Sequence, residues 1–319
     1  MESAQKNLGL TDSISYNSTD NEFPSSKAVY DFIEEAISPG EFVVTATSRV
    51  YVSNNKFAFE KTYENSDITV LRNIVFGGNK RFVAVGEKGV IIYSNDAINW
   101  NKAEIPSGLA SDYMTSIAWG QNKFSAMTNM GEIITSDDGI NWSSMINVGI
   151  TPTYNLIYAN NKWVVVGDSQ IAVSQDLTNW TVAFSGGTGF RAVTYGAGKF
   201  IVGGKSQILY SYDGLNWTLA FSAFSSMLHG LTYSKTMKMY VGVGFQSDEG
   251  FYSSDGINWT VTQLPALTNW NNVTYGANKF VAVGGNNIIY SYDGINWTKI
   301  DNLDSIYYQG IVYIKNGEL

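Results

Sequence analysis

The chain contains no cysteine, which excludes disulfides and thiolate metal sites. Its only histidine, His229, excludes metal sites built from several histidines and leaves one candidate base for a Ser-His-Asp triad. Charged residues make up only 15 % of the chain, against a usual share of about 25 %. The net charge of −8 argues against binding nucleic acid through its phosphates. We therefore expect no metal, no cofactor and no nucleic-acid partner.

Two further features are missing. No apolar run approaches the ~18–20 residues that cross a bilayer, and the N-terminus lacks the basic and apolar regions of a secretory signal. We expect a protein that is made in the bacterial cytoplasm and does not insert into a membrane.

The residues that are abundant favour an all-β fold. The chain has 31 Gly, 20 Tyr and 9 Trp, and hydrophobic residues make up 44 %. Aromatic residues are common in strands and Gly is common in turns, so this composition indicates many short strands around a substantial core.

A short phrase recurs along the sequence. Its complete form is Ser-x-Asp-Gly-Ile-Asn-Trp, and the copies lie about 40 residues apart. The copies span Ser94–Trp100, Ser136–Trp142, Ser174–Trp180, Ser211–Trp217, Ser253–Trp259 and Ser291–Trp297.

Each phrase lies in a unit of four predicted strands, which we letter a to d in chain order. The last complete unit has them at Val273–Tyr275, Phe280–Val283, Ile288–Ser291 and from about Ile295 to Thr298. Asp-Gly between strands c and d is a strong hairpin signal. Four-stranded units repeated at this spacing are typical of the blades of a β-propeller.

The two ends of the repeat region complete one another. Residues 41–62 match residues 279–300 without gaps, with Phe42 on Phe280, and supply strands b, c and d. Ile311–Tyr313 resembles the missing strand a. We therefore predict a seven-bladed propeller over residues 41–319, closed by pairing of the C-terminal strand with the N-terminal blade.

We interpret the repeated turn as structural. Its Asp can accept hydrogen bonds from turn N–H groups, and copies spread around a ring cannot converge on one substrate. Ala97, Leu177 and the pair Asn55-Lys56 replace the usual residues near the Gly position, so we expect those turns to be strained or altered, at a cost of about 1 kcal/mol each. The structural aspartates are Asp96, Asp138, Asp176, Asp213, Asp255 and Asp293.

These units resemble the Asp-box repeats of the BNR or sialidase type, whose pattern is Ser-x-Asp-x-Gly-x-Thr-Trp. Here Gly directly follows Asp, and Asn stands in place of Thr. The resemblance covers residues 41–319 and implies a propeller. It implies no activity, because the family's Asp boxes lie away from its active sites.

Enzymatic alternatives find little support in the sequence. A sialidase needs an arginine triad, and of the four arginines, Arg81 is expected on the turn side, away from Arg49, Arg72 and Arg191. A general glycoside hydrolase needs two facing carboxylates. Candidates by loop position are Glu87, Asp168, Asp248 and Glu249, but nothing in their spacing is specific. We predict a protein that is not an enzyme.

Residues 1–40 do not fit the repeat. A polar linker leads into a predicted helix that ends at Pro39-Gly40. A short helix needs a partner for its apolar stripe, so we predict a stalk that forms a homo-oligomer, expected to be a trimer. The oligomerisation stripe comprises Val29, Phe32, Ile33 and Ala36, with Ile37 beside it.

This region also resembles segments of bacteriophage tail fibres and contractile bacteriocins. The matching residues are Leu10–Ser15 and Pro24–Asp31. The resemblance implies attachment to tail or baseplate proteins, and a place in a virion tail or an extracellular bacteriocin particle.

Function is expected on the face that carries the b–c and d–a loops, because these loops vary between repeats while the other turns do not. We predict a non-enzymatic receptor-binding protein that recognises bacterial surface glycan there. The alternatives are a glycan-degrading hydrolase on the same face, or a purely structural tail or baseplate component. The candidate ligand contacts are Trp270, Tyr113, His229, Glu87, Lys88, Asp168, Gln170, Lys205, Gln207, Gln246, Asp248 and Asn286.

For two of these residues a structural role competes with a binding role. An exposed Trp270 would stack on a sugar ring, but inter-blade packing is an equal alternative. His229 is also consistent with a purely structural residue near the start of a strand.

Overall fold

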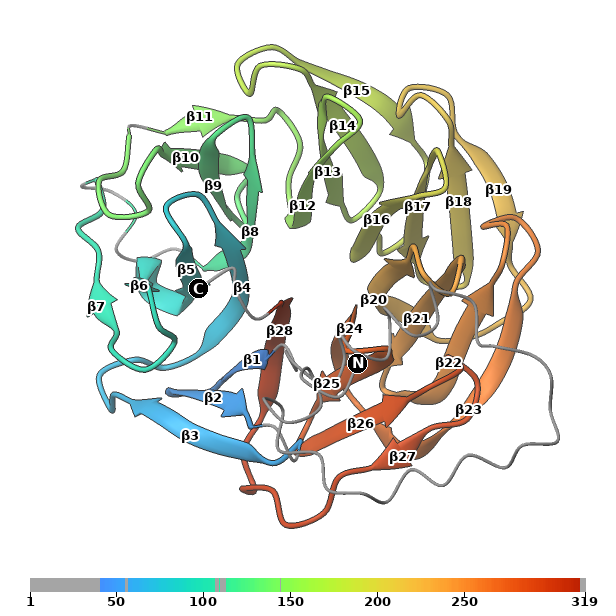
Figure 1. The fold of residues 1–319 in the computed structure, drawn as a ribbon. Helices are drawn as coiled ribbons and strands as arrows, with labels where there is room; N and C mark the ends of the chain where they lie inside the picture. The colour runs from blue at the N-terminus through green and yellow to red at the C-terminus, as the bar shows by residue number, and fades with distance from the viewer. Residues whose placement is uncertain (1–40, 55–56, 107–108, 110–112, 144, 316–319) are drawn as a thin grey trace, which may run out of the picture. The chain divides into compact units, whose positions relative to one another are not determined.

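The computed structural model describes residues 41–315, apart from 55–56, 107–108, 110–112 and 144. Seven four-stranded antiparallel sheets are arranged in a ring (Figure 1). This confirms the predicted all-β, seven-bladed propeller. The predicted N-terminal helix and its oligomerisation stripe lie outside the described residues.

We number the blades 1 to 7 from the one that contains both ends of the described chain. Blade 1 comprises β28 (Tyr308–Ile314), β1 (Glu41–Ala46), β2 (Arg49–Ser53) and β3 (Phe59–Glu64). Blade 2 comprises β4 (Leu71–Gly77), β5 (Arg81–Gly86), β6 (Ile91–Ser94) and β7 (Asn101–Lys102), with a 3-10 turn at Glu87–Gly89. Blade 3 comprises β8 (Met114–Gly120), β9 (Lys123–Thr128), β10 (Glu132–Ser136) and β11 (Ile146–Asn147). Blade 4 comprises β12 (Thr153–Ala159), β13 (Lys162–Gly167), β14 (Gln170–Ser174) and β15 (Trp180–Ser185).

The remaining blades follow the same order. Blade 5 comprises β16 (Ala192–Gly196), β17 (Lys199–Gly204), β18 (Gln207–Ser211) and β19 (Thr218–Phe221). Blade 6 comprises β20 (Met227–Ser234), β21 (Met239–Phe245), β22 (Ser247–Ser253) and β23 (Thr260–Thr268). Blade 7 comprises β24 (Trp270–Gly276), β25 (Lys279–Gly284), β26 (Asn287–Ser291) and β27 (Thr298–Lys299).

The ring closes as the sequence predicts. Strand β28 pairs antiparallel with β1, and Val43 lies opposite Val312, with Phe42 opposite Tyr313. The backbone N–H of Gly310 also donates to Thr45 Oγ1 at 3.0 Å. The first and last described strands therefore share one sheet, and this leaves no gap in the ring.

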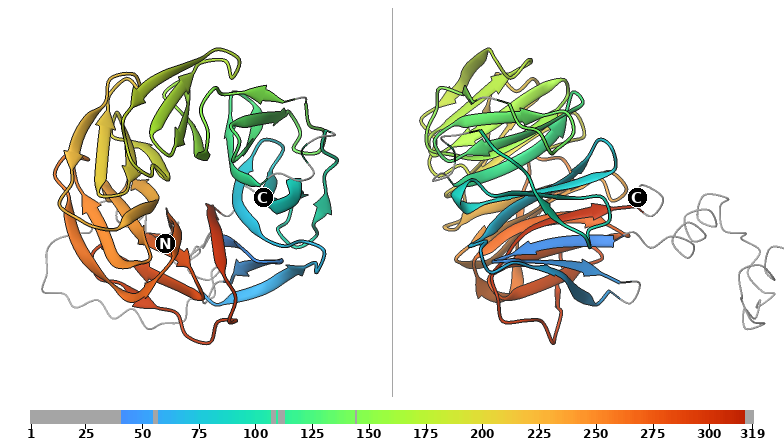
Figure 2. Two further views of the ribbon diagram at one scale, coloured as in Figure 1. Left: turned by 180° about the vertical axis from the view of Figure 1, so that it is seen from behind. Right: turned by 90° about the vertical axis from the view of Figure 1, so that its left-hand side faces the viewer.

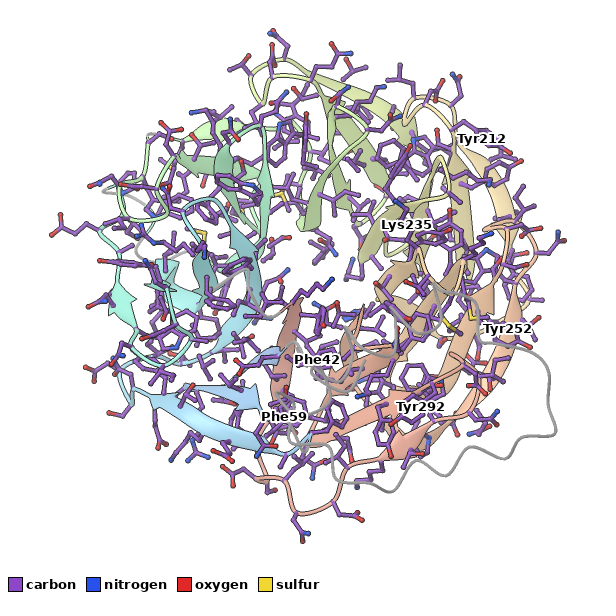
Figure 3. All side chains as sticks on the ribbon, viewed as in Figure 1. Phe42, Phe59, Tyr212, Lys235, Tyr252 and Tyr292 are labelled. Carbon is purple, nitrogen blue, oxygen red and sulfur yellow. The ribbon has the colours of Figure 1, made fainter. Side chains whose placement is uncertain are left out.

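Each blade carries an aromatic pair that anchors the core. The second residue of strand b is a buried aromatic in every blade, and its ring lies 4.5 to 5.0 Å from an aromatic ring of strand a. Figure 3 labels one of these residues, Phe42, on the inner part of blade 1. Rings at such distances add to the energy of area burial. The pairs are Phe42–Tyr313, Phe82–Phe76, Phe124–Trp119, Trp163–Tyr158, Phe200–Tyr195, Tyr240–Tyr233 and Phe280–Tyr275.

The repeated Asp closes the turn between strands c and d. Asp138 Oδ1 accepts hydrogen bonds from the backbone N–H groups of Ile140 and Asn141, at 2.8 and 2.9 Å. Ser136 Oγ donates to the same oxygen, and Asn141 Nδ2 donates to Oδ2. The same four bonds recur around Asp96, Asp176, Asp213, Asp255 and Asp293.

Two turns lack the glycine. Ala97 has φ +57° and Leu177 has φ +67°, in the left-handed region where Gly139 also lies. Both turns keep the hydrogen bonds to their Asp. The N–H to Ser Oγ bond that Gly139, Gly214, Gly256 and Gly294 make is not formed by Ala97 or Leu177, so these two described turns combine a left-handed backbone with a small change in bonding, as expected. The third such pair, Asn55-Lys56, lies outside the described residues.

The antiparallel strands run between two faces of the ring, which Figure 2 shows edge-on. The a–b and c–d turns lie on one, the turn face, and the b–c and d–a loops lie on the other, the loop face. Within the described part of the chain, no helix is long and apolar enough to span a membrane.

Candidate functional site

The structure corrects the expectation for Trp270. Its side chain is fully buried against Val241, Leu264 and Phe280, and its Nε1 donates to the carbonyl oxygen of Ala266 at 3.3 Å. The sequence placed Trp270 in a loop, whereas it is the first residue of β24 and points between blades. Trp270 therefore has the alternative role, which is packing between blades.

Several other candidates on the loop face are held by intramolecular bonds. Glu87 pairs with Arg72, and Asp168 pairs with Arg191. Asp248 Oδ2 accepts from Gln263 Nε2 at 2.6 Å.

The remaining candidates divide between bonded and exposed residues. Gln170 Nε2 donates to Ser185 Oγ at 3.3 Å, and Gln207 Nε2 donates to the carbonyl oxygen of Thr188 at 3.1 Å. Tyr113 is half exposed. The other exposed candidates are Lys88, Lys205, Gln246 and Asn286.

A cavity of about 150 Å³ opens on the axis of the ring, where the inner strands begin at the loop face. Every blade contributes one polar side chain from the start of strand a, and we call these seven residues the mouth ring. Of the seven, the sequence analysis proposed only His229 as a ligand contact. The mouth ring comprises Arg72, Thr115, Tyr154, Arg191, His229, Asn271 and Gln309.

The repeat itself contained the signal that would have found these residues. They stand near one position of the unit, at the start of the strand that leads to the a–b turn. What the sequence does not show is that this position faces the axis, because the direction of a side chain depends on how the strands pair.

Arg72 is fixed at the mouth by the loop that follows β5. Its Nη2 donates to Glu87 Oε1 at 2.5 Å, and its guanidinium lies 5.7 Å from the centre of the Tyr113 ring. Its Nε is buried and has no hydrogen-bond partner among the described residues. Arg72 therefore keeps an unused donor at a buried position, and such a donor favours an acceptor.

Arg191 enters the mouth from blade 5. Its guanidinium lies over the ring of Tyr154 at 3.2 Å, and its Nη1 pairs with Asp168 Oδ1 at 3.3 Å. Stacking on the ring and pairing with a carboxylate leave the planar group little freedom to rotate. The guanidinium is thus held in place in the absence of a ligand.

His229 is neutral in this environment. Its ring stacks on Phe245 with centroids 4.3 Å apart. Burial and, to a smaller extent, the positive charge of Arg191 together lower the pKa of His229 to about 3. At neutral pH its ring therefore offers one donor and one acceptor.

A layer of amides lies next to the mouth ring. Asn73, Asn155 and Asn272 line the same cavity. Ser116 Oγ donates to Asn155 Oδ1 at 3.1 Å, and Asn271 Nδ2 donates to the carbonyl oxygen of Tyr308 at 2.8 Å. Amide groups that both donate and accept suit a ligand rich in hydroxyl groups.

The charge of the lining is one-sided. Two arginines line the cavity, and none of the described residues that line it is Asp or Glu. The facing carboxylates that a glycoside hydrolase needs are thus not supplied by the described lining. The lining residues can therefore form hydrogen bonds with a ligand and bind a negatively charged group.

No protein-family model matches the chain, and no curated protein sequence matches it. Solved structures do resemble it. YCF48 bound to D1 peptide is 14 % identical over 76 % of this chain and 93 % of that chain, with a TM-score of 0.58. The nidogen/laminin complex is 12 % identical over 86 % and 98 %, with a TM-score of 0.59. Virginiamycin B lyase from Staphylococcus aureus is 12 % identical over 75 % and 91 %, with a TM-score of 0.63. At these identities the shared property is the fold, a β-propeller with neighbours of the YCF48 and virginiamycin B lyase type.

Proposed function

We propose that this protein is a non-enzymatic receptor-binding protein of a phage tail or a contractile bacteriocin, and that it binds bacterial surface glycan on its loop face. The observation that carries the proposal is the mouth ring, in which seven blades each direct one polar side chain to a single cavity. The resemblance of residues 1–40 to tail-fibre segments supports the setting.

The cavity favours recognition of the end of a glycan chain. At about 150 Å³ it is smaller than the ~300–1,000 Å³ of a pocket for a drug-sized ligand. A wider space of about 400 Å³ between the inner strands shares Asn73, Asn155, Leu231 and Asn272 with this cavity, and the two together suit the end of a glycan chain better than an extended stretch of polymer. The neighbouring loops, with Lys88, Lys205 and Gln246 exposed, would then contact the next sugars.

Protein binding is the second candidate. The similar structures include YCF48 with D1 peptide and nidogen with laminin, which are propellers in complex with a peptide or a protein. On this reading the chain is a structural tail component. A hydrolase on the same face is a further alternative, and it would draw on Glu87, Asp168, Asp248 or Glu249.

Binding of the full-length chain to immobilised bacterial surface polysaccharides tests the proposal. Gln309→Ala and Thr115→Val each remove one polar group from the mouth ring, and we expect each to weaken binding about threefold to tenfold. Ser254→Ala, at an exposed position of a c–d turn, is the matched control and should bind as the parent does.

Three outcomes would contradict the proposal. Binding to no polysaccharide, together with intact attachment to tail proteins, would favour the structural role. Release of new reducing ends from host polysaccharide would favour the hydrolase. Unchanged binding by both mouth variants would place the contact elsewhere.

A further inference from the structure

We propose that the glycan is acidic, and that its negatively charged group, a carboxylate or a phosphate, binds between Arg72 and Arg191 in the mouth of the propeller. This inference rests on the proposed function, because it names the class of ligand for the same site.

The first argument is the distribution of charge. The chain has a net charge of −8 and only four arginines, Arg49, Arg72, Arg81 and Arg191. Two of the four line one small cavity, and no acidic residue is among its described lining. Each guanidinium is also paired with a carboxylate that lies outside the lining, Glu87 or Asp168, so the cavity is faced by charged hydrogen-bond donors and not by acceptors of the same kind, which points to an anionic ligand.

The second argument is the arrangement of the pair. Arg72 belongs to blade 2 and Arg191 to blade 5, three blades apart in a ring of seven. The two guanidinium groups line the same cavity from different parts of the ring, Arg72 beside Tyr113 and Arg191 over the ring of Tyr154. An anion on the axis would receive hydrogen bonds from both, and planar guanidinium groups suit carboxylate and phosphate oxygens.

The third argument is that the arginines are already positioned. Glu87 and Asp168 each pair with one of them, but neither carboxylate lines the cavity. The two acids thus reduce the repulsion between the guanidinium groups without filling the space of a ligand.

Calorimetric titration of the full-length chain tests the inference with three defined probes. Oligogalacturonate supplies carboxylates, a glycerol phosphate oligomer supplies phosphates, and a malto-oligosaccharide is the neutral comparison. We expect one anionic probe to bind and the neutral probe not to bind. Which anionic probe binds identifies the source of the charge.

Substitutions locate the charge contact. Arg72→Gln should weaken binding of the anionic probe about tenfold or more, since hydrogen bonds between charged groups contribute about 1.5–3 kcal/mol. Arg72→Lys keeps the charge but loses the planar group, so its affinity for the anionic probe should lie between that of the parent and that of Arg72→Gln. Lys235→Gln makes the same change of charge in an a–b turn of the turn face and should leave affinity unchanged (Figure 3).

His229 provides a second readout that loss of folding would not mimic. As the only histidine of the chain, it gives a single imidazole signal in an NMR titration. An anion beside Arg191 would change the electrostatic field at the neutral imidazole, so the bound probe should shift the His229 signal at pH 7, where the chain is folded. Thermal melting of each variant shows whether it folds.

The results separate this inference from the proposed function. If neutral surface polysaccharides bind and Arg72→Gln leaves their affinity unchanged, the inference is wrong and the glycan-binding function stands. If neither neutral nor acidic polysaccharides bind, both fail. An anionic probe that binds equally well to the parent, Arg72→Gln and an Arg191→Gln variant, with no shift of the His229 signal at pH 7, would also overturn the inference.

Discussion

At the scale of single residues, the carboxylates of the c–d turns have one common environment. In Asp213 the backbone N–H of Asn216, the Asn216 side chain and the backbone N–H of Leu215 all donate to the ionised group and hold its pKa well below the usual range. In Asp293 burial opposes ionisation, but the hydrogen bonds from Asn296 and Ile295 outweigh it and lower the pKa to about 2. The sequence predicted this bonding, because an Asp before a tight turn commonly accepts from the N–H groups that follow it.

These lowered values predict acid sensitivity. An Asp whose pKa is lower in the folded chain stabilises the fold above its unfolded pKa and loses that contribution as the pH falls toward the folded pKa. We expect the melting temperature to fall steeply from about pH 4 toward pH 2, because six turns titrate together. Asp213→Asn removes one of the six and should give a shallower decline. A melting temperature that is constant between pH 7 and pH 2 would contradict this.

At the scale of strands, contacts between blades depend on small residues at the end of strand a. Gly196 ends β16, and a Cβ there would lie 2.1 Å from Cγ of Tyr233 on the inner strand of the next blade. Gly120 and Tyr158 repeat this approach at 2.2 Å. The sequence shows these glycines beside the turns, but only the packed ring shows that an aromatic ring of the next blade occupies the space of the missing side chain.

We expect Gly196→Ala to lower the free energy of unfolding by about 1–3 kcal/mol, since the added methyl group forces Tyr233 to move. Ala159, which ends β12 in blade 4, is the matched position where a methyl group is already accommodated. Ala159→Gly should lower stability by about 1 kcal/mol, through chain entropy and the loss of one methyl group that packs against the neighbouring core. Denaturant unfolding measures both. Equal effects of the two substitutions would show that the aromatic contact does not limit this position.

The strands also show where prediction from the sequence stopped. The six copies of the phrase located six blades, because each unit combines its own hairpin signals with its own apolar strands, and the match of residues 41–62 to residues 279–300 located the seventh. The start of β24 was missed because β23 extends to Thr268, and so a stretch interpreted as a loop is mostly strand. The mouth ring was missed for a related reason. Whether a side chain points toward the axis depends on how its strand pairs with the other strands of the unit.

At the scale of the whole ring, stability depends on the pairing of β28 with β1. The pairing joins residues from opposite ends of the propeller, with Val43 opposite Val312. The gapless match of residues 41–62 to residues 279–300 predicted this closure, since the first unit lacked one strand and the last segment supplied it.

A covalent link at this point tests the closure. Val43→Cys combined with Val312→Cys joins two cross-strand partners in a chain that has no other cysteine. Under oxidising conditions we expect an increase of about 2–4 kcal/mol in the free energy of unfolding, which a reductant should abolish. Val43→Cys with Ile311→Cys is the control, because adjacent residues of a strand point to opposite faces and should not link to Val43→Cys. Cross-linking of the control pair but not of the first pair would contradict the register.

Because each blade contributes its own side chain to the mouth ring, the seven positions are attached to independent stretches of backbone. A substitution at one of them leaves the backbone of the other six unchanged, and among the side chains only Tyr154 and Arg191 are in stacking contact with one another. New ligand preferences can therefore arise by point changes, with no loop lengthened or rebuilt. Among related chains that recognise different hosts, we expect sequence diversity to concentrate at these seven positions while the aromatic pairs of the core stay constant.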